Sequence, residues 1–335
     1  MQHLSPLALI HRKHQTPVNQ LLFHSTQKGI YMATSKIFSP SEIVGILPPL
    51  LTPFDENEDF VESVLRQEIR YMLSKGVHGL VPGGSAGEGN TLSTDELRQI
   101  VGATCEEAAG RVPVVAGIIV NSTRQAIERA RAVADLGVSA LQITPVHYIY
   151  KNDDDAMIRH FRSIYDAVGI PIIIYNVIPW NYLSVDLMLR MMREVPGVFG
   201  VKQSASDLKS MADLIQRCEP HQRIYAAIDA LLYPTFALSA HGAISQILAA
   251  VPGPCVELWN LVRAGNHVEA LELHGKLLRM WNAISGDNRL AVTKYTMTLQ
   301  GVPVGGPRAP LTPASIKQRE AASRALSELL GTDNI

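Results

Sequence analysis

The chain has 335 residues, of which 47% are hydrophobic and 18% charged, and its formal net charge is −1 at pH 7. This composition is typical of a globular protein with a sizeable core. The balanced charge gives no reason to expect nucleic acid or an acidic membrane as a partner. No run of about 18 apolar residues is present, which argues against a membrane span.

Cysteine usage indicates the compartment. Cys105, Cys218 and Cys255 lie far apart and form no CxxC pair. Such spacing is typical of free thiols in a reducing environment and argues against a disulfide framework or a cysteine metal site. We therefore expect a cytoplasmic protein.

The N-terminal segment differs from the rest of the chain. Residues 1–41 contain four His and no Asp or Glu. We expect residues 1–42 to be a disordered extension, or to include an upstream start before a natural beginning at Met32. A cleaved targeting peptide is an alternative, although a mitochondrial one should carry more arginine.

A repeating β-α pattern begins at Ile43. Short apolar runs, typical of strands buried on both faces, start near residues 45, 79, 112, 140, 171, 198, 224 and 242. Helical patterns follow these runs at residues 60–75, from 93, at 122–137, 153–168 and 184–194, from 206, at 231–239 and from 252. Ser93, with Glu96 three residues later, predicts a capping box at the start of the second helix.

Eight β-α units within roughly 200 to 250 residues favour a (β/α)₈ TIM barrel, here residues 43–265. The alternative, a doubly wound open sheet, should carry a dinucleotide fingerprint, and none is present. Only helical patterns follow, at residues 268–285, 287–300 and 313–330. We expect residues 266–335 to be C-terminal helices packed on the barrel.

The active site of such a barrel lies where its strands end. The residues at these predicted ends are Thr52, Ser85 with its loop, Ile119, Thr144, Tyr175, Lys202, Asp229 and 244–246. Tyr175 and Lys202 end consecutive strands 27 residues apart (202 minus 175), which is one strand–helix–strand unit. The two side chains should therefore be neighbours at one edge of the parallel sheet.

A lysine at this position can act as an amine nucleophile toward a 2-oxo acid and form a Schiff base. Its usual pKa of about 10.4 must fall for this reaction, and a neighbouring tyrosine can move the protons. The alternative is a strand-end lysine that reaches solvent, which is the commoner situation for lysine in general. The presence of Tyr175 beside Lys202 favours the chemical site.

The glycine-rich loop, residues 83–90, follows the second predicted strand. Its N–H groups and the Ser85 hydroxyl can hold a carboxylate, whereas the Gly-Lys-Ser/Thr of a phosphate-binding loop is absent. No histidine and carboxylate pattern has metal-ligand spacing, so we expect no metal and no cofactor. Trp180 and Asn181 follow the fifth predicted strand and are equally consistent with a pocket or lid and with surface packing.

The chain resembles the dihydrodipicolinate synthase / N-acetylneuraminate lyase family. The motifs that carry the resemblance are residues 51–54, 83–88, 174–177, 200–203 and 242–245, in the family's order and spacing over residues 43–300. The resemblance implies a (β/α)₈ barrel, usually homotetrameric, that forms a Schiff base with pyruvate or another 2-oxo acid. It implies Lys202 as the Schiff-base lysine and Tyr175 as its acid/base partner. Ser85 and the Ala86 N–H would hold the carboxylate, and Ile244 would line the pocket.

Three positions depart from the pattern of the synthases. Ala86 replaces the second hydroxyl residue of the loop. Either His147 or Tyr148 substitutes for a tyrosine of the synthases' proton relay, or the relay is absent. Residues 177–181, directly after Tyr175-Asn176, contain no arginine but include Trp180, which favours a bulkier and less anionic partner than the synthases bind.

We therefore expect a class I, metal-independent lyase that makes or breaks a C–C bond of a pyruvate-like 2-oxo acid. A small-molecule substrate and a homo-oligomer, tetramer or dimer, are expected, with neither nucleic acid nor membrane as partner. Alternatives with the same imine chemistry are a 2-oxo acid dehydratase and a 4-hydroxy-tetrahydrodipicolinate synthase. An alternative of another class is a non-catalytic ligand-binding barrel.

Overall fold

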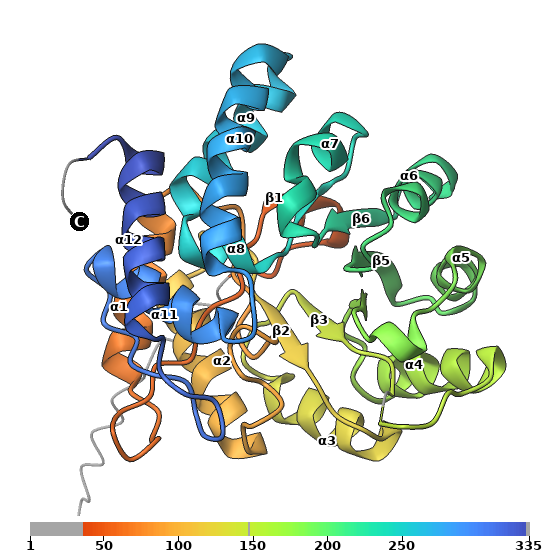
Figure 1. Cartoon of the computed structure of the whole chain (residues 1–335). Helices are drawn as coiled ribbons and strands as arrows, with labels where there is room; N and C mark the ends of the chain where they lie inside the picture. Colours follow the sequence, from red (N-terminus) through yellow and green to blue (C-terminus); the bar gives the residue numbers. More distant parts are fainter. Residues whose placement is uncertain (1–35, 147, 333–335) are drawn as a thin grey trace, which may run out of the picture. The chain divides into compact units, whose positions relative to one another are not determined.

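Seven short parallel strands form one curled sheet in the computed structural model, which describes residues 36–146 and 148–332. The strand order is β1-β7-β6-β5-β4-β3-β2, so each strand from β2 to β7 pairs with the next one in sequence, and β7 also pairs with β1. Figure 1 shows the curled sheet among its helices. The strands are β1 Gly45–Ile46, β2 Val115–Ile118, β3 Ala140–Ile143, β4 Ile172–Asn176, β5 Val198–Gln203, β6 Arg223–Ala226 and β7 Gly242–Ala243. Every residue of β2 to β5 is buried, as expected for strands covered on both faces.

The predicted second strand is reduced to isolated bridges. Leu80 bridges Val114 and Val81 bridges Pro49, so these two residues link the β2 and β1 sides of the sheet. Pro49 is itself a bridge residue, and prolines at positions 48, 82 and 113 flank the bridges. Proline has no N–H to donate to a strand ladder, which explains why no regular strand forms here. Among the described residues the structure thus has seven regular strands, one fewer than predicted.

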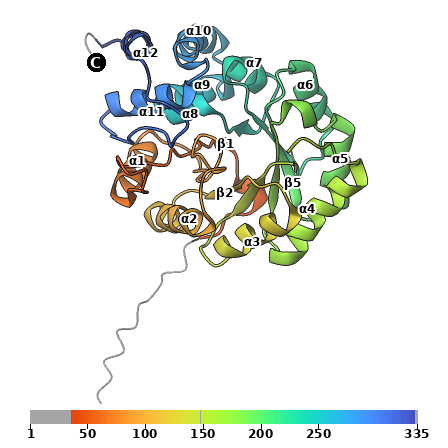
Figure 2. The ribbon, with the colours of Figure 1, turned by 60° about the horizontal axis from the view of Figure 1, so that its bottom comes forward.

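Helices surround the strands (Figure 2). The first eight are α1 Glu62–Ser74, α2 Thr94–Ala108, α3 Thr123–Val133, α4 Asp154–Val168, α5 Val185–Glu194, α6 Leu208–Arg217, α7 Leu232–Ala237 and α8 Gln246–Ala250. The predicted capping box is confirmed, because the Ser93 hydroxyl accepts the Glu96 N–H and the Glu96 carboxylate accepts the Ser93 N–H. Asp153 and Ser184 cap α4 and α5 through their side chains.

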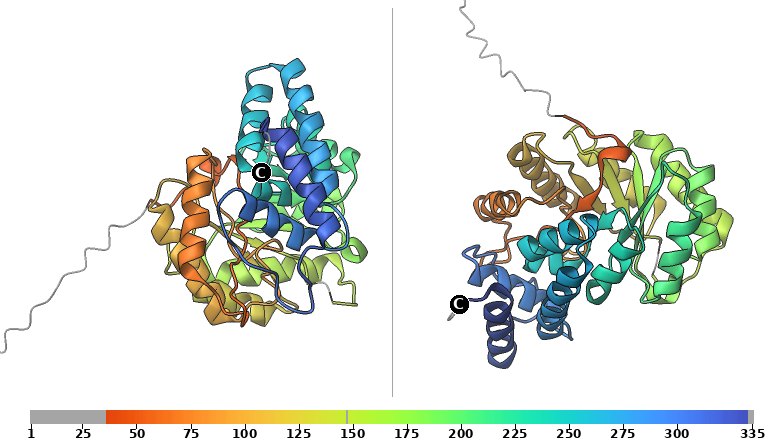
Figure 3. Two further views of the ribbon diagram at one scale, coloured as in Figure 1. Left: turned by 60° about the vertical axis from the view of Figure 1, so that its left-hand side comes forward. Right: turned by 90° about the horizontal axis from the view of Figure 1, so that it is seen from above.

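Four further helices follow the sheet: α9 Pro252–Arg263, α10 His267–Ile284, α11 Arg289–Leu299 and α12 Ile316–Leu330. Helices α9, α10 and α12 lie side by side (Figure 3). Helix α12 begins three residues later than predicted, because Ser315 is its N-cap and accepts the Gln318 N–H. Residues 302–313, which we call the C-terminal strap, connect α11 to α12 without regular structure.

Two apolar clusters hold the strands in place. The larger fills the space between sheet and helices. The smaller lies inside the curl of the sheet and consists of Ile43, Leu47, Val81, Val115, Ala140, Ile173, Phe199, Tyr225 and Ile244. The Tyr225 hydroxyl donates to the Ile43 carbonyl oxygen at 2.7 Å, which satisfies a buried polar group across the curl. No helix within residues 36–146 and 148–332 is long and apolar enough to span a bilayer.

Candidate active site

Tyr175 and Lys202 are direct partners in the register of β4 and β5. Both side chains are buried, with exposed fractions of 5% and 4%. The Lys202 Nζ lies 3.7 Å from the centroid of the Tyr175 ring. The neighbourhood predicted from the 27-residue spacing is therefore confirmed.

Burial lowers the pKa of Lys202, because the charged ammonium loses its hydration in this position. The Tyr175 hydroxyl and the Asp229 carboxylate oppose the shift, since both stabilise the ammonium form. The net direction is downward and favours the neutral amine, which is the form that attacks a carbonyl.

The glycine-rich loop brings Ser85 to this pair. The Ser85 Oγ lies 3.2 Å from the Tyr175 hydroxyl oxygen, within hydrogen-bond distance. The loop closes on itself, because the N–H groups of Gly87 and Gly89 both donate to the Gly84 carbonyl oxygen. A Cβ at Gly89 would lie 2.0 Å from the Gly83 carbonyl oxygen, so this closure requires glycine.

These residues border one cavity of about 380 Å³ at the carboxyl ends of the strands. Five of the predicted site residues line it: Lys202, Tyr175, Ser85, Ala86 and Ile244. Its other lining residues are Pro49, Val177, Tyr182, Ser204, Ser206, Ala227, Ile228, Asp229, Ala230, Ser245, Gln246, Trp281 and Arg289. Lysine, aspartate and arginine thus face one space large enough for a small organic acid.

Three other predicted site residues, Tyr148, Trp180 and Asn181, do not line this cavity. Trp180 is 64% exposed, and its Nε1 donates to the Tyr148 carbonyl oxygen at 3.1 Å. The Asn181 side chain is buried and donates to the Val146 carbonyl oxygen at 2.7 Å. Both contacts join the loops that follow β4 and β3. His147 lies outside the described residues.

The cavity also contains residues that the sequence analysis did not select. Asp229 and Gln246 stand at predicted strand ends, so their position was a usable signal. Arg289 begins α11 and Trp281 lies on α10, and neither belongs to a β-α unit of the sheet. Nothing in the strand pattern could have placed these two residues at the site.

Asp229 is held firmly beside the lysine. Its Oδ1 accepts the Ile247 N–H at 2.7 Å, at the start of α8. Burial raises the pKa of Asp229, and the nearby Lys202 partly opposes this increase. In the part of the chain that the structure describes, no group of three or more His, Cys, Asp or Glu side chains could hold a metal ion.

The fold and the site together define a lyase of the aldolase type that works through a lysine Schiff base. The chain belongs to the dihydrodipicolinate synthetase family, whose sequence model matches residues 42–329. The family predicted from the motifs is thereby confirmed.

Relatives of known name and structure support this membership. A 4-hydroxy-tetrahydrodipicolinate synthase of Bradyrhizobium diazoefficiens is 36% identical over 285 residues, which cover 84% of this chain and 95% of that protein. The synthase of Methanopyrus kandleri is 32% identical over 291 residues, 86% of this chain and 97% of the relative. The crystal structure of CdNal from Clostridium difficile, in complex with mannosamine, has a TM-score of 0.80 and 27% identity, covering 86% of this chain and 99% of that one.

Proposed function

We propose that the protein makes or breaks a C–C bond of a pyruvate-like 2-oxo acid through an imine on Lys202. The Lys202 amine attacks C2 of the acid, and the carbonyl oxygen leaves as water. Loss of a C3 proton gives an enamine, which attacks an aldehyde carbon; in the reverse direction the C3–C4 bond breaks and its electrons pass to the imine nitrogen. The observation that carries this proposal is the buried Tyr175–Lys202 pair facing the cavity.

The remaining roles follow from position. Tyr175 would move protons at the imine carbon and at the substrate hydroxyl. Ser85 and the Ala86 N–H would hold the carboxylate of the acid. The Ser85 Oγ is within hydrogen-bond distance of Tyr175, and no described residue accepts a hydrogen bond from the Ala86 N–H. Ile244, fully buried, would limit the pocket beneath the acid.

Borohydride trapping tests this function. We expect incubation with pyruvate and borohydride to add one reduced pyruvyl group, located on the peptide containing Lys202. A panel of other 2-oxo acids, read by intact mass, would rank the keto half of the substrate. Folded protein that traps no acid would overturn the enzyme function and leave a ligand-binding barrel.

The synthase activity named for the Bradyrhizobium and Methanopyrus relatives is the second candidate, favoured by their 36% and 32% identity. It requires an aldehyde that carries a carboxylate, and residues 177–181, directly after Asn176, contain no arginine. A coupled assay with pyruvate and aspartate semialdehyde distinguishes the synthase from a lyase that uses another aldehyde, because only the synthase should give robust turnover. A dehydratase would use the same lysine and tyrosine, and it would release water without an aldehyde product.

Arg289 bears on the charge of the second substrate. Its exposed side chain lines the cavity, whereas Trp180, one of the two features that favoured a less anionic partner, does not. We therefore propose that Arg289 receives an anionic group of the aldehyde.

For Arg289→Gln, we expect kcat/KM for condensation of pyruvate with succinic semialdehyde to fall by about tenfold, which is one lost charge-assisted contact. Condensation with butanal, the matched uncharged aldehyde, should change little. Arg324→Gln, an exposed arginine on α12, is the control. Equal losses with both aldehydes would contradict a carboxylate contact.

We further propose three features of the whole protein. Residues 79–81 complete an eight-membered barrel within residues 43–265, with residues 266–335 as its helical extension and residues 1–42 as an N-terminal extension. The chain assembles as a homo-oligomer, a tetramer or a dimer. The enzyme acts in the cytoplasm.

A further inference from the structure

A buried ion pair lies at the end of the glycine-rich loop. The Lys294 Nζ, on α11, lies 2.7 Å from the Glu88 Oε1, and the two side chains are 1% and 2% exposed. Neither residue lines the cavity. Burial of two charges is costly unless they are paired and further hydrogen-bonded, so this arrangement calls for a specific role.

Lys294 joins three separate parts of the chain. Besides Glu88, its Nζ donates to the Thr52 carbonyl oxygen at 2.8 Å and to the Gly306 carbonyl oxygen at 2.7 Å. Thr52 is itself tied to the loop, because its hydroxyl donates to the Gly87 carbonyl oxygen at 2.6 Å. One ammonium group therefore connects the glycine-rich loop, the segment after β1 and the C-terminal strap.

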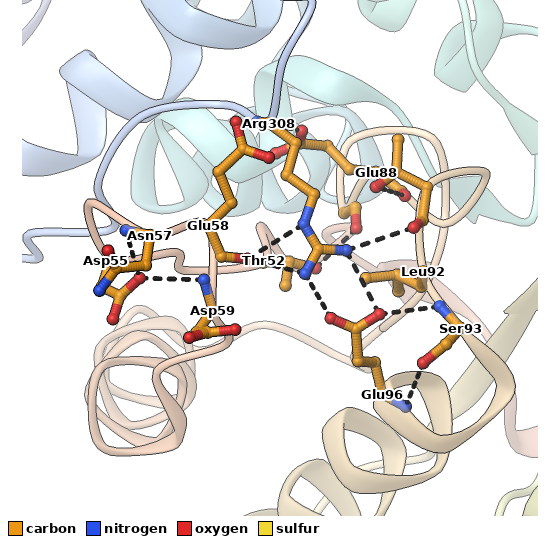
Figure 4. Close-up of polar contacts among 12 residues, drawn as sticks. Thr52, Asp55, Asn57, Glu58, Asp59, Glu88, Leu92, Ser93, Glu96 and Arg308 are labelled. Atoms are coloured by element: carbon orange, nitrogen blue, oxygen red, sulfur yellow. Dashed lines mark hydrogen bonds and ion pairs between the residues drawn. The ribbon is translucent and has the colours of Figure 1, made fainter.

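Arg308 holds the strap against the same loop (Figure 4). Its backbone N–H donates to the Glu88 Oε2 at 2.8 Å. Its guanidinium pairs with Glu96 and donates to the Thr91 carbonyl oxygen at 3.2 Å and to the Glu58 carbonyl oxygen at 2.8 Å. Both carboxylate oxygens of Glu88 are thus bound by residues more than 200 positions away in sequence.

Phe54 completes the contact between strap and loop. The Lys294 Nζ lies 4.7 Å and the Arg308 Cζ 4.1 Å from the centroid of its ring. Gly305 passes so close that a Cβ there would lie 2.2 Å from the Phe54 carbonyl oxygen, and its φ is +74°. The strap therefore fits this position only with glycine at residue 305.

We propose that Glu88, Lys294 and Arg308 are positioning residues, through which the C-terminal strap fixes the glycine-rich loop in its carboxylate-binding geometry. Ser85 and Ala86 line the cavity, while Glu88, three residues after Ser85, is anchored in the network. Glu88 has a left-handed backbone with φ +55°, which a non-glycine residue rarely adopts without such an anchor. The inference rests on the proposed function, in which this loop holds the 2-oxo acid.

The test is Lys294→Met, which keeps the side-chain length and removes the charge. We measure the pyruvate concentration that gives half-maximal borohydride trapping on Lys202, and expect it to rise by about tenfold or more, because small displacements of a binding group weaken its contacts steeply. The extent of trapping at saturating pyruvate should stay within about twofold, since the lysine is untouched. Arg279→Gln is the control, because it breaks an exposed ion pair between α10 and α12 at 2.6 Å.

A double-mutant cycle separates positioning from general destabilisation. Ser85→Ala alone should raise the half-maximal pyruvate concentration, and in the Lys294→Met background the same change should have a smaller effect, because the loop is already displaced. Additive effects would overturn the proposal. If Lys294→Met does not fold, Arg308→Gln takes its place, because its side chain is partly exposed and its backbone contact to Glu88 remains.

Hydrogen exchange gives a readout that does not depend on chemistry. Amides of residues 83–91 should exchange faster in Lys294→Met than in the parent or in Arg279→Gln, with β4 and β5 unchanged. Unchanged exchange in the loop would overturn the positioning role even if trapping succeeds. Absence of trapping in the parent protein, with faster loop exchange in the variant, would instead overturn the proposed function and leave the anchor in place.

Discussion

Replacement of Lys202 by methionine is expected to abolish turnover and the borohydride-stable adduct together. Lys202 is the only lysine among the described residues that line the cavity, so no other amine can form the imine there. Loss of a catalytic nucleophile lowers kcat by at least about 10⁴-fold, because the remaining contacts cannot replace the covalent step. The measurement is turnover alongside intact mass after trapping. The variant should fold normally, because methionine has a similar length and avoids the burial of a basic group.

Tyr175→Phe is the matched comparison for this variant. It keeps the ring next to the Lys202 Nζ and removes only the hydroxyl that lies 3.2 Å from the Ser85 Oγ. Trapping on Lys202 should persist at high pyruvate, while turnover falls by about 10²–10⁴, the range for loss of a positioned acid/base group. An adduct on another lysine in Lys202→Met would contradict the assignment. So would undiminished turnover in Tyr175→Phe.

The Tyr175–Lys202 pair was predictable because a parallel sheet converts sequence spacing into spatial adjacency. Two strand ends separated by one helix must meet at the same edge, and the register of β4 and β5 pairs these residues directly. The positions of strand ends also listed Ser85 with its loop and Ile244, and the family resemblance assigned roles to Ser85, Ala86 and Ile244, which all line the cavity. A local pattern also predicted the start of α2 at the Ser93–Glu96 capping box, because capping side chains act within one turn of the helix.

The residues that the sequence analysis did not predict make contacts with segments distant in sequence. Arg289, Lys294 and Arg308 lie in or after α11, and no period in the sequence shows which loop a C-terminal helix will meet. The regular strand predicted at residues 79–81 failed because prolines in the neighbouring segments remove donors from its ladder, an effect that its own apolar pattern does not reveal.

The C-terminal region contributes to the site in two independent ways. Arg289 places positive charge at the cavity. Lys294 and Arg308, which follow Lys202 in sequence, fix the glycine-rich loop, which precedes it. The sheet therefore supplies the lysine and the tyrosine. The segments after the sheet determine which substrate charge the cavity accepts and how the glycine-rich loop is held. This division permits changes of substrate without changes to the imine chemistry.

Glu68 gives the second prediction with a large effect, which concerns stability. It lies on α1, is fully buried, and its Oε1 accepts the Leu51 N–H at 2.9 Å. Its Oε2 has no hydrogen-bond partner among the described residues. Burial raises the pKa of this carboxyl from its usual 4.5 to about 8, against the opposing influence of the Leu51 N–H and Lys294.

The sign of the pH dependence follows from proton counting. Between pH 4.5 and about 8 the folded protein holds a proton on Glu68 that the unfolded chain has lost, so the free energy of unfolding should fall as pH rises through this window. The loss is roughly 3–5 kcal/mol over the window and levels off above it. Glu68→Gln mimics the protonated form and keeps the acceptor for Leu51, so its stability should lack this decline.

Urea unfolding from pH 5 to 9 measures the difference between the parent and Glu68→Gln, with Glu320→Gln on the exposed face of α12 as control. The two curves should nearly meet at pH 5 and diverge toward pH 8, with Glu68→Gln the more stable. Parallel curves would mean that Glu68 is ionised in the folded protein and shares Lys294 with Glu88. Divergence of the curves would establish that Glu68 is neutral in the folded protein, so that Glu88 is the single anionic partner of Lys294. Under this condition the ion pair holds Glu88 firmly at the end of the glycine-rich loop.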